Sequence, residues 1–363
     1  MCKWDSYVLY DNKTEITQFW KSYYSKKTAA KVLFVLGKGF DPRMNNIIKL
    51  WCSTVNVPMT CLTMDFPAGD ASDGFDLYQT NVQELKNLQN TYGFSINEIK
   101  VDSLLDWERR IKEMGKKLAR LDLSDYSDII LDVSSMPRAI YFNVAKVFYE
   151  KEKERGRNLF FMVSENVEID NLIVKDRNEE EVFPLVGFKS MIEIESYLDK
   201  RNILIPLIGE ERKMMLESIY NDFKPSDVCP VMPFPSHDPR RSDKLLLEYN
   251  QFLKDRLYIE PQSVTYAHER NPFELYRLLD ELIHSYQNTL KPISGNICFG
   301  IALLTSKLLS LGALLVGLEH NDCVAIYNVS STSYKIKDKK KIVEANQKSK
   351  PFLLWITGEA YEE

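Results

Sequence analysis

The chain has 363 residues, of which 44% are hydrophobic and 27% charged, a composition that excludes a disordered or fibrous protein and is sufficient for two domains. The formal net charge is -5, so no overall positive charge favours nucleic acid or an anionic membrane surface. Any anionic ligand is therefore expected to bind at a local site.

No segment predicts export or membrane insertion. The N-terminal residues lack an apolar signal-peptide core, and the longest apolar stretch, 297–318, is interrupted by Thr305, Ser306 and Lys307. Six cysteines and four histidines are scattered along the chain, with no cysteine pair at CxxC spacing, so no metal site is predicted. We expect a cytoplasmic protein with reduced cysteines and no direct membrane binding.

The first half of the chain contains five short apolar runs that predict buried parallel strands, because their apolar residues are continuous rather than alternating. These runs are 31–37, 58–66, 96–102, 127–134 and 158–164. Helical patterns stand between them, such as SLLDWERRIKEMGKKLARL and PRAIYFNVAKVFYEKEKER. Strands that alternate with helices predict a parallel sheet with right-handed crossovers.

The second half repeats this order of strands and helices. Its predicted strands are 202–209, 227–234, 263–267, 296–304 and 322–330. The two halves match with a nearly constant offset: Gly37 and Gly209 end the first strands, and Arg138 and Lys307 follow the fourth. The prediction is an α/β protein of two Rossmann-like parallel-sheet halves with pseudo-duplicated topology. The alternative is that two unrelated open α/β domains share this rhythm.

These elements divide the chain into four parts. A first Rossmann-like domain with an N-terminal extension covers 1–165, and a second covers 202–334. The stretch 166–201, which includes the acidic tract DRNEEEVF, is the expected connector. Residues 335–363 are the expected C-terminal tail, and their run of charged residues predicts a solvated face.

The turn GKGFDPRMNN after the first strand is a candidate ligand site, because open parallel sheets bind ligands at strand carboxyl ends near the switch point. Gly37, Lys38 and Gly39 let the backbone turn tightly near a ligand, and the next helix start can hold an anion. Asp41 is a candidate helix cap and Arg43 a candidate phosphate ligand. The turn is neither a Walker A loop nor a full GxGxxG, so an ordinary capped turn is the alternative.

The turns after the fourth strands form a second pair of candidate sites. Each combines hydroxyls with one cation: Asp132, Ser134, Ser135 and Arg138 in the first half, and Thr305, Ser306 and Lys307 in the second. Hydroxyls and a cation at a helix start are typical of an anion site, and the same residue types also cap helices. Both interpretations are open.

The turns after the second strands carry further candidates. Asp65 ends the second strand of the first half, where an acidic residue often hydrogen-bonds a ribose hydroxyl. The corresponding turn of the second half, PFPSHDPRRSD, offers Ser236, Asp238, Arg240 and Arg241 as ligand or interface residues. The arginine pair suits either a phosphate or the carboxylates of a protein partner.

The two-half plan and its fourth-strand turns resemble the CARF-type Rossmann-like sensors of prokaryotic defence systems. The likeness lies in Thr305-Ser306-Lys307 and in Ser134-Ser135 with Arg138, which are similar to a family turn rich in small residues, hydroxyls and a lysine. The resemblance implies that these turns bind a cyclic oligonucleotide, usually across a dimer. The usual glycine of that turn is absent from both halves, and no effector nuclease or helix-turn-helix pattern follows.

The stretch VLFVLGKGFDPRM followed by CLTMDFP also looks like the first two strands of class I methyltransferases of the leucine-carboxyl type. That resemblance implies that Gly37 and Gly39 hold S-adenosylmethionine and that Asp65 binds its ribose. The likeness fades beyond Asp65, and a duplicated second half is not a feature of that family.

Three classes of function stay open. The one we expect is a sensor or regulatory protein that binds a nucleotide or another small phosphate-bearing ligand. The second is an enzyme acting on a nucleotide or S-adenosylmethionine, the only cofactors the sequence suggests, although no GxSxG or HExxH motif defines a reaction. The third is an interaction subunit that docks through Arg240 and Arg241. We expect a homo-oligomer or a subunit of a larger complex, without a broad nucleic-acid surface.

Overall fold

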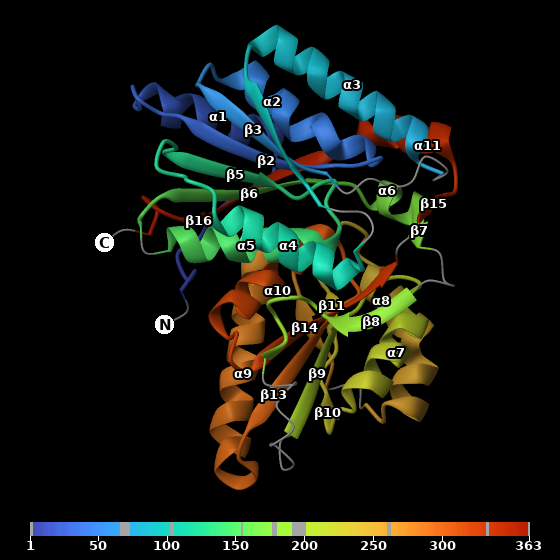
Figure 1. Cartoon of the computed structure of the whole chain (residues 1–363). Helices are drawn as coiled ribbons and strands as arrows, with labels where there is room; N and C mark the ends of the chain where they lie inside the picture. The colour runs from blue at the N-terminus through green and yellow to red at the C-terminus, as the bar shows by residue number, and fades with distance from the viewer. Residues whose placement is uncertain are drawn as a thin grey trace. The chain divides into compact units, whose positions relative to one another are not determined.

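The computed structural model describes residues 3–65, 73–101, 105–153, 155–175, 180–190, 201–259, 263–331 and 334–361 (Figure 1). The chain folds into two compact units. One, here called the split unit, consists of Ser6–Glu179 and Ser331–Glu363. The other, called the inserted unit, consists of Met1–Asp5 and Glu180–Ser330.

The split unit alternates strands and helices along its first segment and returns to the same sheet at its end. Its described strands are β1 Val8–Tyr10, β2 Val32–Lys38, β3 Met59–Asp65, β4 Ser95–Lys100, β5 Asp128–Asp132, β6 Asn158–Glu165, β7 Ile173–Lys175, β15 Tyr334–Ile336 and β16 Lys350–Thr357. Its described helices are α1 Lys13–Ser25, the 3-10 helix η1 Pro42–Asn45, α2 Asn46–Thr54, α3 Phe75–Tyr92, α4 Trp107–Ala119, α5 Arg138–Glu152, α6 Val167–Leu172 and α11 Lys339–Asn346.

The main sheet of the split unit has seven strands in the order β1-β16-β6-β5-β2-β3-β4. All neighbouring pairs among β2, β3, β4, β5 and β6 are parallel. In chain order these five strands are arranged 3-2-1-4-5, the order of a doubly wound Rossmann sheet. At the far edge, β16 is antiparallel to β6, and β1 is antiparallel to β16.

The inserted unit has its own seven-stranded sheet, in which β10 lies off the main path β12-β11-β9-β13-β14-β8. Its described strands are β8 Glu180–Pro184, β9 Arg201–Leu207, β10 Asp227–Val228, β11 Val231–Pro233, β12 Thr265–Ala267, β13 Ile297–Leu303 and β14 Val324–Ser331. Its described helices are α7 Lys213–Phe223, α8 Arg241–Gln251, the π-helix η4 Phe252–Arg256, α9 Pro272–Ser294 and α10 Lys307–Glu319.

The five strands β9, β11, β12, β13 and β14 again stand in the order 3-2-1-4-5, and each neighbouring pair among them is parallel. The prediction of an α/β protein with two Rossmann-like halves of the same topology is therefore confirmed. The second strand differs in detail, because the stretch 227–234 forms two short strands, β10 and β11, that both pair with β9.

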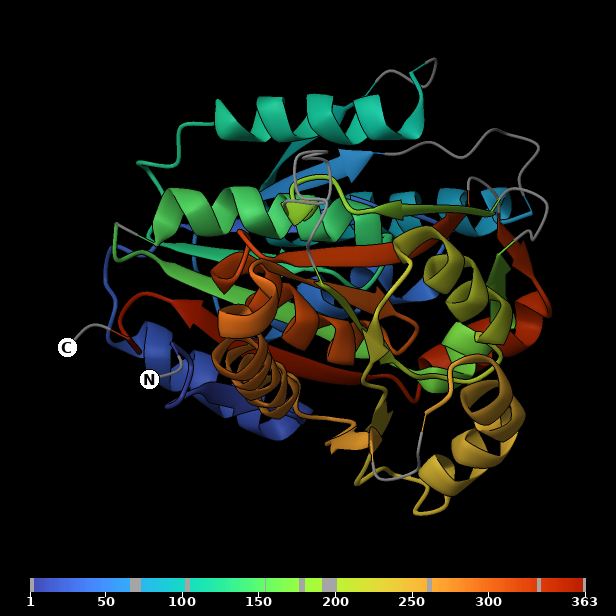
Figure 2. The same ribbon diagram turned by 90° about the horizontal axis from the view of Figure 1, so that it is seen from below.

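Helices cover both faces of the main sheet in the split unit. Figure 1 shows α1 and α2 on one face and α4 and α5 on the other, and Figure 2 shows α4 and α5 side by side. Under α1 and α2 lies an aromatic core that includes Trp20, Trp51 and Phe160. Helix α4 begins where Asp106 accepts a hydrogen bond from the backbone N–H of Arg109, a helix cap.

The C-terminal part of the chain differs from the expected tail. Residues 335–363 contain α11 and β16, and β16 is an interior strand of the sheet in the split unit. The physical reason is the apolar run from Phe352 to Ile356, whose side chains are buried, although a charged run precedes it. The expected connector 166–201 also contains α6, β7 and β8, and β8 belongs to the sheet of the inserted unit.

Candidate functional site

In each unit the first and fourth parallel strands are neighbours within the sheet: β2 lies beside β5, and β9 lies beside β13. In open α/β sheets the crevice that binds ligands forms outside the carboxyl ends of such strands, where the strand order reverses. The candidate turns after the first and fourth strands therefore lie at the switch point of their own sheet, whereas those after the second strands follow β3 and β11.

In both units a glycine near the carboxyl end of the first strand, Gly37 in β2 and Gly209 just after β9, packs against the turn after the fourth strand. The Ser135 hydroxyl donates a hydrogen bond to the carbonyl oxygen of Gly37 at 2.6 Å. A Cβ atom added to Gly37 would lie 2.6 Å from Cγ of Met136, and one added to Gly209 would lie 2.2 Å from the carbonyl oxygen of Leu304. At Gly209 the neighbour is a backbone atom, so only glycine fits there, whereas at Gly37 the neighbour is the side chain of Met136.

Replacing Gly209 by Ala is expected to destabilise the inserted unit by about 3 kcal/mol, because the added methyl group meets a backbone carbonyl that has no rotamer to change. The matched control is Gly39→Ala, where the nearest neighbour of the added Cβ lies at 3.5 Å, an ordinary contact. Urea unfolding of both variants against the wild-type chain measures the difference. Equal stability of all three proteins would contradict the close approach.

The turn after β2 is organised by a buried ion pair. Asp41 caps η1 by accepting a hydrogen bond from the backbone N–H of Arg43 at 3.0 Å. The Arg43 guanidinium, 1% exposed, donates to both carboxylate oxygens of Asp41 and to Asp170, the last at 2.7 Å. Burial alone would lower the pKa of Arg43, but the charges of Asp170 and Asp41 hold it well above its ordinary value. Arg43, expected from the sequence to face a phosphate, therefore lies between two carboxylates.

Asn81 on α3 holds the same turn through its side chain. Its amide group donates to the carbonyl oxygens of Gly39 and Asp41, both at 2.9 Å. Asn45 in turn donates to the carbonyl oxygen of Asn81 at 2.9 Å. These hydrogen bonds fix the conformation of the turn within the protein itself.

In the turn after β5, the candidate hydroxyls bind other parts of the chain. Ser134 donates from its backbone N–H and its hydroxyl to Asp132, and its hydroxyl oxygen accepts from the backbone N–H of Ser164 at 2.8 Å. Ser135 binds Gly37, as described above. Arg138 is half-buried and is the first residue of α5, whose N-cap residue contributes no side-chain hydrogen bond.

The corresponding turn of the inserted unit contains a helix cap. Ser306 accepts a hydrogen bond at its hydroxyl from the backbone N–H of Leu309 at 3.2 Å, at the start of α10. Thr305 is buried and Lys307, the first residue of α10, is half-buried. The hydroxyl of Ser306 thus has the capping role that stood as the alternative to ligand binding.

Asp65 lies at the carboxyl end of β3 and is 6% exposed. It accepts a hydrogen bond from the Tyr78 hydroxyl at 3.2 Å and stands opposite Lys38 in the β2–β3 register. Burial, together with the charge of Asp65, raises the pKa of Tyr78 to about 12. Burial lowers the pKa of Lys38, which forms an ion pair with Glu98. Lys100, the last residue of β4, also pairs with Glu98, at 3.0 Å, so the carboxyl ends of β2, β3 and β4 carry two acids and two lysines.

In the inserted unit, Arg241 links the turns after β9 and β12. Its guanidinium donates two hydrogen bonds to Glu210, at 2.6 and 2.8 Å, and one to Glu269 at 2.5 Å. Burial alone would raise the pKa of Glu210, but hydrogen bonds and charge from Arg241 hold it below its ordinary value. Arg241 is 9% exposed, so its charge is directed into this ion-pair cluster.

The remaining candidates of that turn lie around the start of α8. Ser236 donates to the carbonyl oxygen of Pro233 at 2.6 Å, and Asp238 pairs with Lys244 at 2.6 Å. Arg240 is exposed and is the N-cap residue of α8. These contacts stabilise the turn, and the exposed Arg240 side chain is accessible to a ligand or a protein partner.

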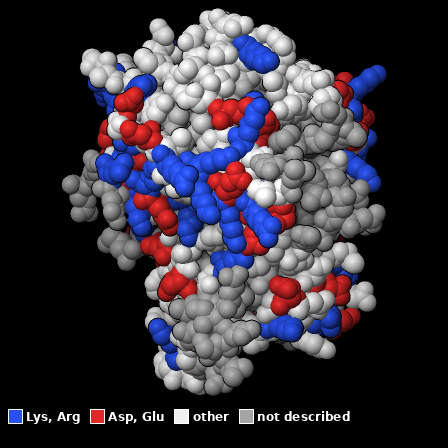
Figure 3. All heavy atoms as spheres, viewed as in Figure 1, with Lys and Arg blue, Asp and Glu red and all other residues white. Residues whose placement is uncertain are grey.

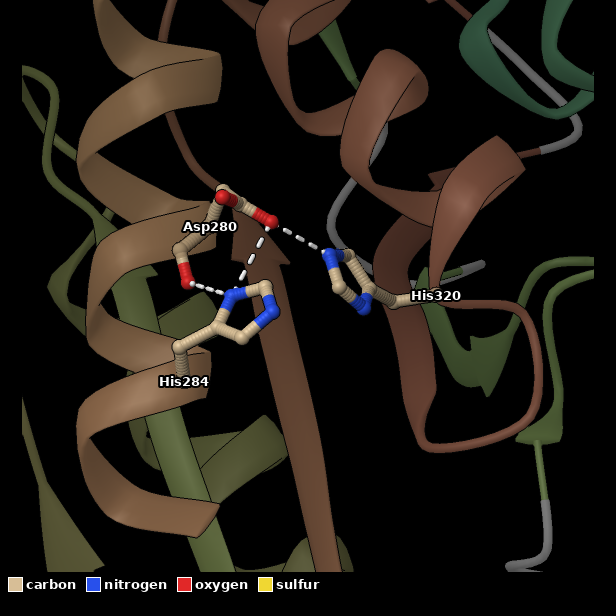
Figure 4. A group of neighbouring side chains, drawn as sticks. All are labelled: Asp280, His284 and His320. Carbon is tan, nitrogen blue, oxygen red and sulfur yellow. Dashed lines mark hydrogen bonds and ion pairs between the residues drawn. The ribbon is translucent and has the colours of Figure 1, made fainter. Parts of the chain in front are cut away.

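The structure also brings together three residues that were not predicted from the sequence to form a site. Asp280, His284 and His320 in the inserted unit place one potential metal-ligand atom each within 4.8 Å of one another (Figure 4). The sequence carried one signal, because Asp280 and His284 are four residues apart on a predicted helix and so share a face. His320 could not be joined to them from its position in the chain.

Figure 3 shows lysine and arginine side chains gathered in one region, interleaved with acidic ones. Within α4, surface lysines form ion pairs with glutamates one helical turn away, such as Lys112 with Glu108 and Lys117 with Glu113. Exposed pairs of this kind contribute little stability and form a surface of mixed sign. In the part of the chain that the structure describes, no helix is long and apolar enough to cross a membrane.

Comparison with known proteins does not assign this chain to a family. No protein-family model and no curated protein matches the chain. A Pseudomonas aeruginosa UCBPP-PA14 protein assigned to the universal stress proteins is 10% identical, covering 89% of this chain and 98% of its own, with a TM-score of 0.24. The cytoplasmic domain of a prokaryotic cation chloride cotransporter is 10% identical, covering 84% and 96%, with a TM-score of 0.24. Methyltransferase FkbM from Methylobacillus flagellatus KT is 12% identical, covering 93% of each chain, with a TM-score of 0.21. Likenesses at these TM-scores carry no argument about function, and the fold assignment rests on the strand order.

Proposed function

We propose that the split unit binds a nucleotide-type ligand at the carboxyl ends of β2 and β3, and that the protein is a sensor or regulatory protein. The observation that carries this proposal is Asp65, a buried carboxylate at the end of the second parallel strand, beside the turn from Gly37 to Gly39 on the first. In doubly wound sheets, these two positions receive the ribose and the phosphate-bearing part of a nucleotide.

The surroundings of Asp65 suit a ribose. The Tyr78 hydroxyl donates to Oδ1 of Asp65 and so orients the carboxylate. An ionised carboxylate has about four acceptor positions, which leaves capacity for the two adjacent hydroxyls of a ribose. Hydrogen bonds to a charged group contribute about 1.5–3 kcal/mol each, so this contact would supply a large part of the binding free energy.

The start of α5 is the better place for a phosphate in this unit. Its N-cap residue, Pro137, supplies no capping side chain, and Arg138 adds a cation to the positive end of the helix dipole. The start of η1 is less suited, because the Asp41 carboxylate already caps it and would repel an anion. The sheet order brings the turn after β5 beside the turn after β2.

A sensor is favoured over an enzyme by the burial of Ser134. The Ser134 hydroxyl donates a hydrogen bond to the Asp132 carboxylate, an arrangement that can activate a hydroxyl as a nucleophile. Ser134 is 0% exposed, however, and its hydroxyl also accepts from the backbone N–H of Ser164. A hydroxyl held in this way is part of the structural support of the turn. A role in a prokaryotic defence system belongs to this proposal if the ligand is a cyclic oligonucleotide.

The test is thermal unfolding of the full chain with ATP, cyclic oligoadenylate and S-adenosylmethionine, each added separately. A ligand at a hundred times its dissociation constant stabilises the folded state by about 2.7 kcal/mol.

Replacing Asp65 by Asn is expected to weaken the binding of every ribose-containing ligand about 10- to 100-fold. Arg138→Gln is expected to weaken only the ligands that carry phosphate. Asp125→Asn and Arg109→Gln, whose side chains are 75% and 76% exposed, are the matched controls.

The outcomes separate the alternatives. Stabilisation by S-adenosylmethionine alone, sensitive to Asp65→Asn and not to Arg138→Gln, would replace the sensor with the methyltransferase-type enzyme. Stabilisation by a phosphate ligand that survives both substitutions would place the site elsewhere. If none of the three ligands shifts the unfolding temperature, the proposal is wrong.

A further inference from the structure

A cluster of two imidazoles and one carboxylate lies in the inserted unit and includes none of the turn residues discussed above (Figure 4). Nε2 of His320 lies 2.6 Å from Oδ1 of Asp280, and Nδ1 of His284 lies 3.3 Å from the same oxygen. The two imidazole rings meet edge to face, with centroids 5.5 Å apart. Two of the four histidines of the chain therefore adjoin one carboxylate.

The fold positions these side chains firmly. Asp280 and His284 are one turn apart on α9, so both point from the same face of that helix. His320 immediately follows α10, which packs along α9. Its backbone is fixed by hydrogen bonds, since its N–H donates to Val316 at 2.8 Å and its carbonyl accepts from Val324 at 2.8 Å. Three potential metal-ligand atoms thus converge, two from α9 and one from the residue that follows α10.

We propose that Asp280, His284 and His320 form a binding site for Zn²⁺. Two imidazole nitrogens and one carboxylate oxygen, with a water in the fourth position, are a common ligand set for zinc. With metal–ligand distances of about 2.0–2.2 Å, ligand atoms of a tetrahedral site lie roughly 3.3 Å apart. The 3.3 Å between His284 and Asp280 has this value. The 2.6 Å between His320 and Asp280 is a hydrogen-bond length that lengthens when a metal replaces the proton.

The exposure of the three side chains fits an open metal site. The side chains of Asp280 and His320 are 9% and 14% exposed, whereas that of His284 is 56% exposed. A metal held by the buried Asp280 and the partly buried His320 therefore has its free coordination position on the solvent side, next to His284. The ion would join α9 to the end of α10, because His320 belongs to one helix end and the other two ligands to the neighbouring helix.

The competing explanation is a metal-free pair of hydrogen bonds, in which Nε2–H of His320 donates to the Asp280 carboxylate and Nδ1–H of His284 donates to the Asp280 backbone carbonyl at 2.9 Å. In that case His284 contributes nothing to cation binding. The two explanations therefore differ in the role of an exposed residue, His284, whose substitution leaves the core intact.

The experiment is isothermal titration of the full, chelator-treated chain with ZnCl₂, followed by visible absorption spectra with Co²⁺. One equivalent is expected to bind, with the intense Co²⁺ bands of a tetrahedral site. Loss of groups that only support a metal ligand typically costs 10–100-fold in affinity, so His284→Gln and His320→Gln should each weaken binding by more than about 100-fold. The matched control is His237→Gln, an exposed histidine of the same unit outside the cluster, which should leave the affinity within about threefold.

Two results would overturn the zinc site. One is a wild-type chain that binds Zn²⁺ no more tightly than its His284→Gln variant. The other is a Co²⁺ spectrum that does not change between these two proteins. Circular dichroism of each variant guards against loss of folding, and His284→Gln is the decisive variant because its side chain is largely exposed. The site is independent of the nucleotide proposal, which concerns the other unit.

Discussion

Replacing Leu353 by Asp is expected to unfold the split unit and to leave the inserted unit folded. Leu353 is 0% exposed and stands in β16 between Met162 of β6 and Tyr10 of β1. A carboxylate there loses its water without gaining a partner, which costs several kcal/mol. The substitution also removes an apolar side chain whose burial contributes about 1.5–3 kcal/mol. Since domains are stable by about 5–15 kcal/mol in total, this loss is of the same order as the whole stability.

The matched control lies in the same strand. Lys350→Asp changes an exposed residue at the start of β16 and is expected to have little effect on folding. Hydrogen exchange followed by mass spectrometry distinguishes the two units, because it reports protection peptide by peptide. In the Leu353→Asp protein, β2, β5 and β6 should lose protection while β9 and β13 keep it. Retained protection of β5 and β6 would mean that the C-terminal strand is dispensable, as expected for a tail.

Replacing Arg43 by Met is expected to destabilise the split unit by about 3–5 kcal/mol, the usual cost of removing one partner from a buried ion pair. The substitution leaves the Asp41 carboxylate, 8% exposed, and the Asp170 carboxylate, 28% exposed, without their cation. Adding Asp41→Asn to Arg43→Met should recover part of the loss, because the amide still caps η1 and carries no charge.

Urea unfolding of the single and double variants measures this coupling. The control is Lys112→Ala, which removes an exposed ion pair with Glu108 and is expected to change the unfolding free energy by less than about 0.5 kcal/mol. If Arg43→Met instead left stability unchanged and weakened a phosphate ligand, the guanidinium would be a ligand-binding group, as the sequence suggested. The structure favours the first result because Arg43 is almost fully buried.

The central parallel strands could be predicted from the sequence because they are continuous apolar runs. β2, β3 and β5 are buried along nearly their whole length, and a pattern of that kind needs no knowledge of distant partners. The position of β16 could not be predicted in this way. Its run is equally apolar, but its neighbours β6 and β1 are far away in the chain, and a charged helix precedes it.

The roles of the candidate site residues were harder to predict than the strands, because the same residue types bind ligands and stabilise turns. A hydroxyl at a helix start fits an anion site and a helix cap equally well, and Ser306 has the second role. Arg43 and Arg241 are cations near strand ends, but each also pairs with a carboxylate from a distant part of the chain, Asp170 for Arg43 and Glu269 for Arg241. The proximity of His320 to Asp280 likewise depends on the packing of α9 against α10.

The most direct test of the nucleotide proposal is a crystal structure of the full chain with the ligand that stabilises it most. We expect the ribose hydroxyls to lie within hydrogen-bond distance of the Asp65 carboxylate. The rest of the ligand should then pass over the turn from Gly37 to Gly39 toward the start of α5. A ligand bound at any other place, with no contact to Asp65, would contradict the proposal.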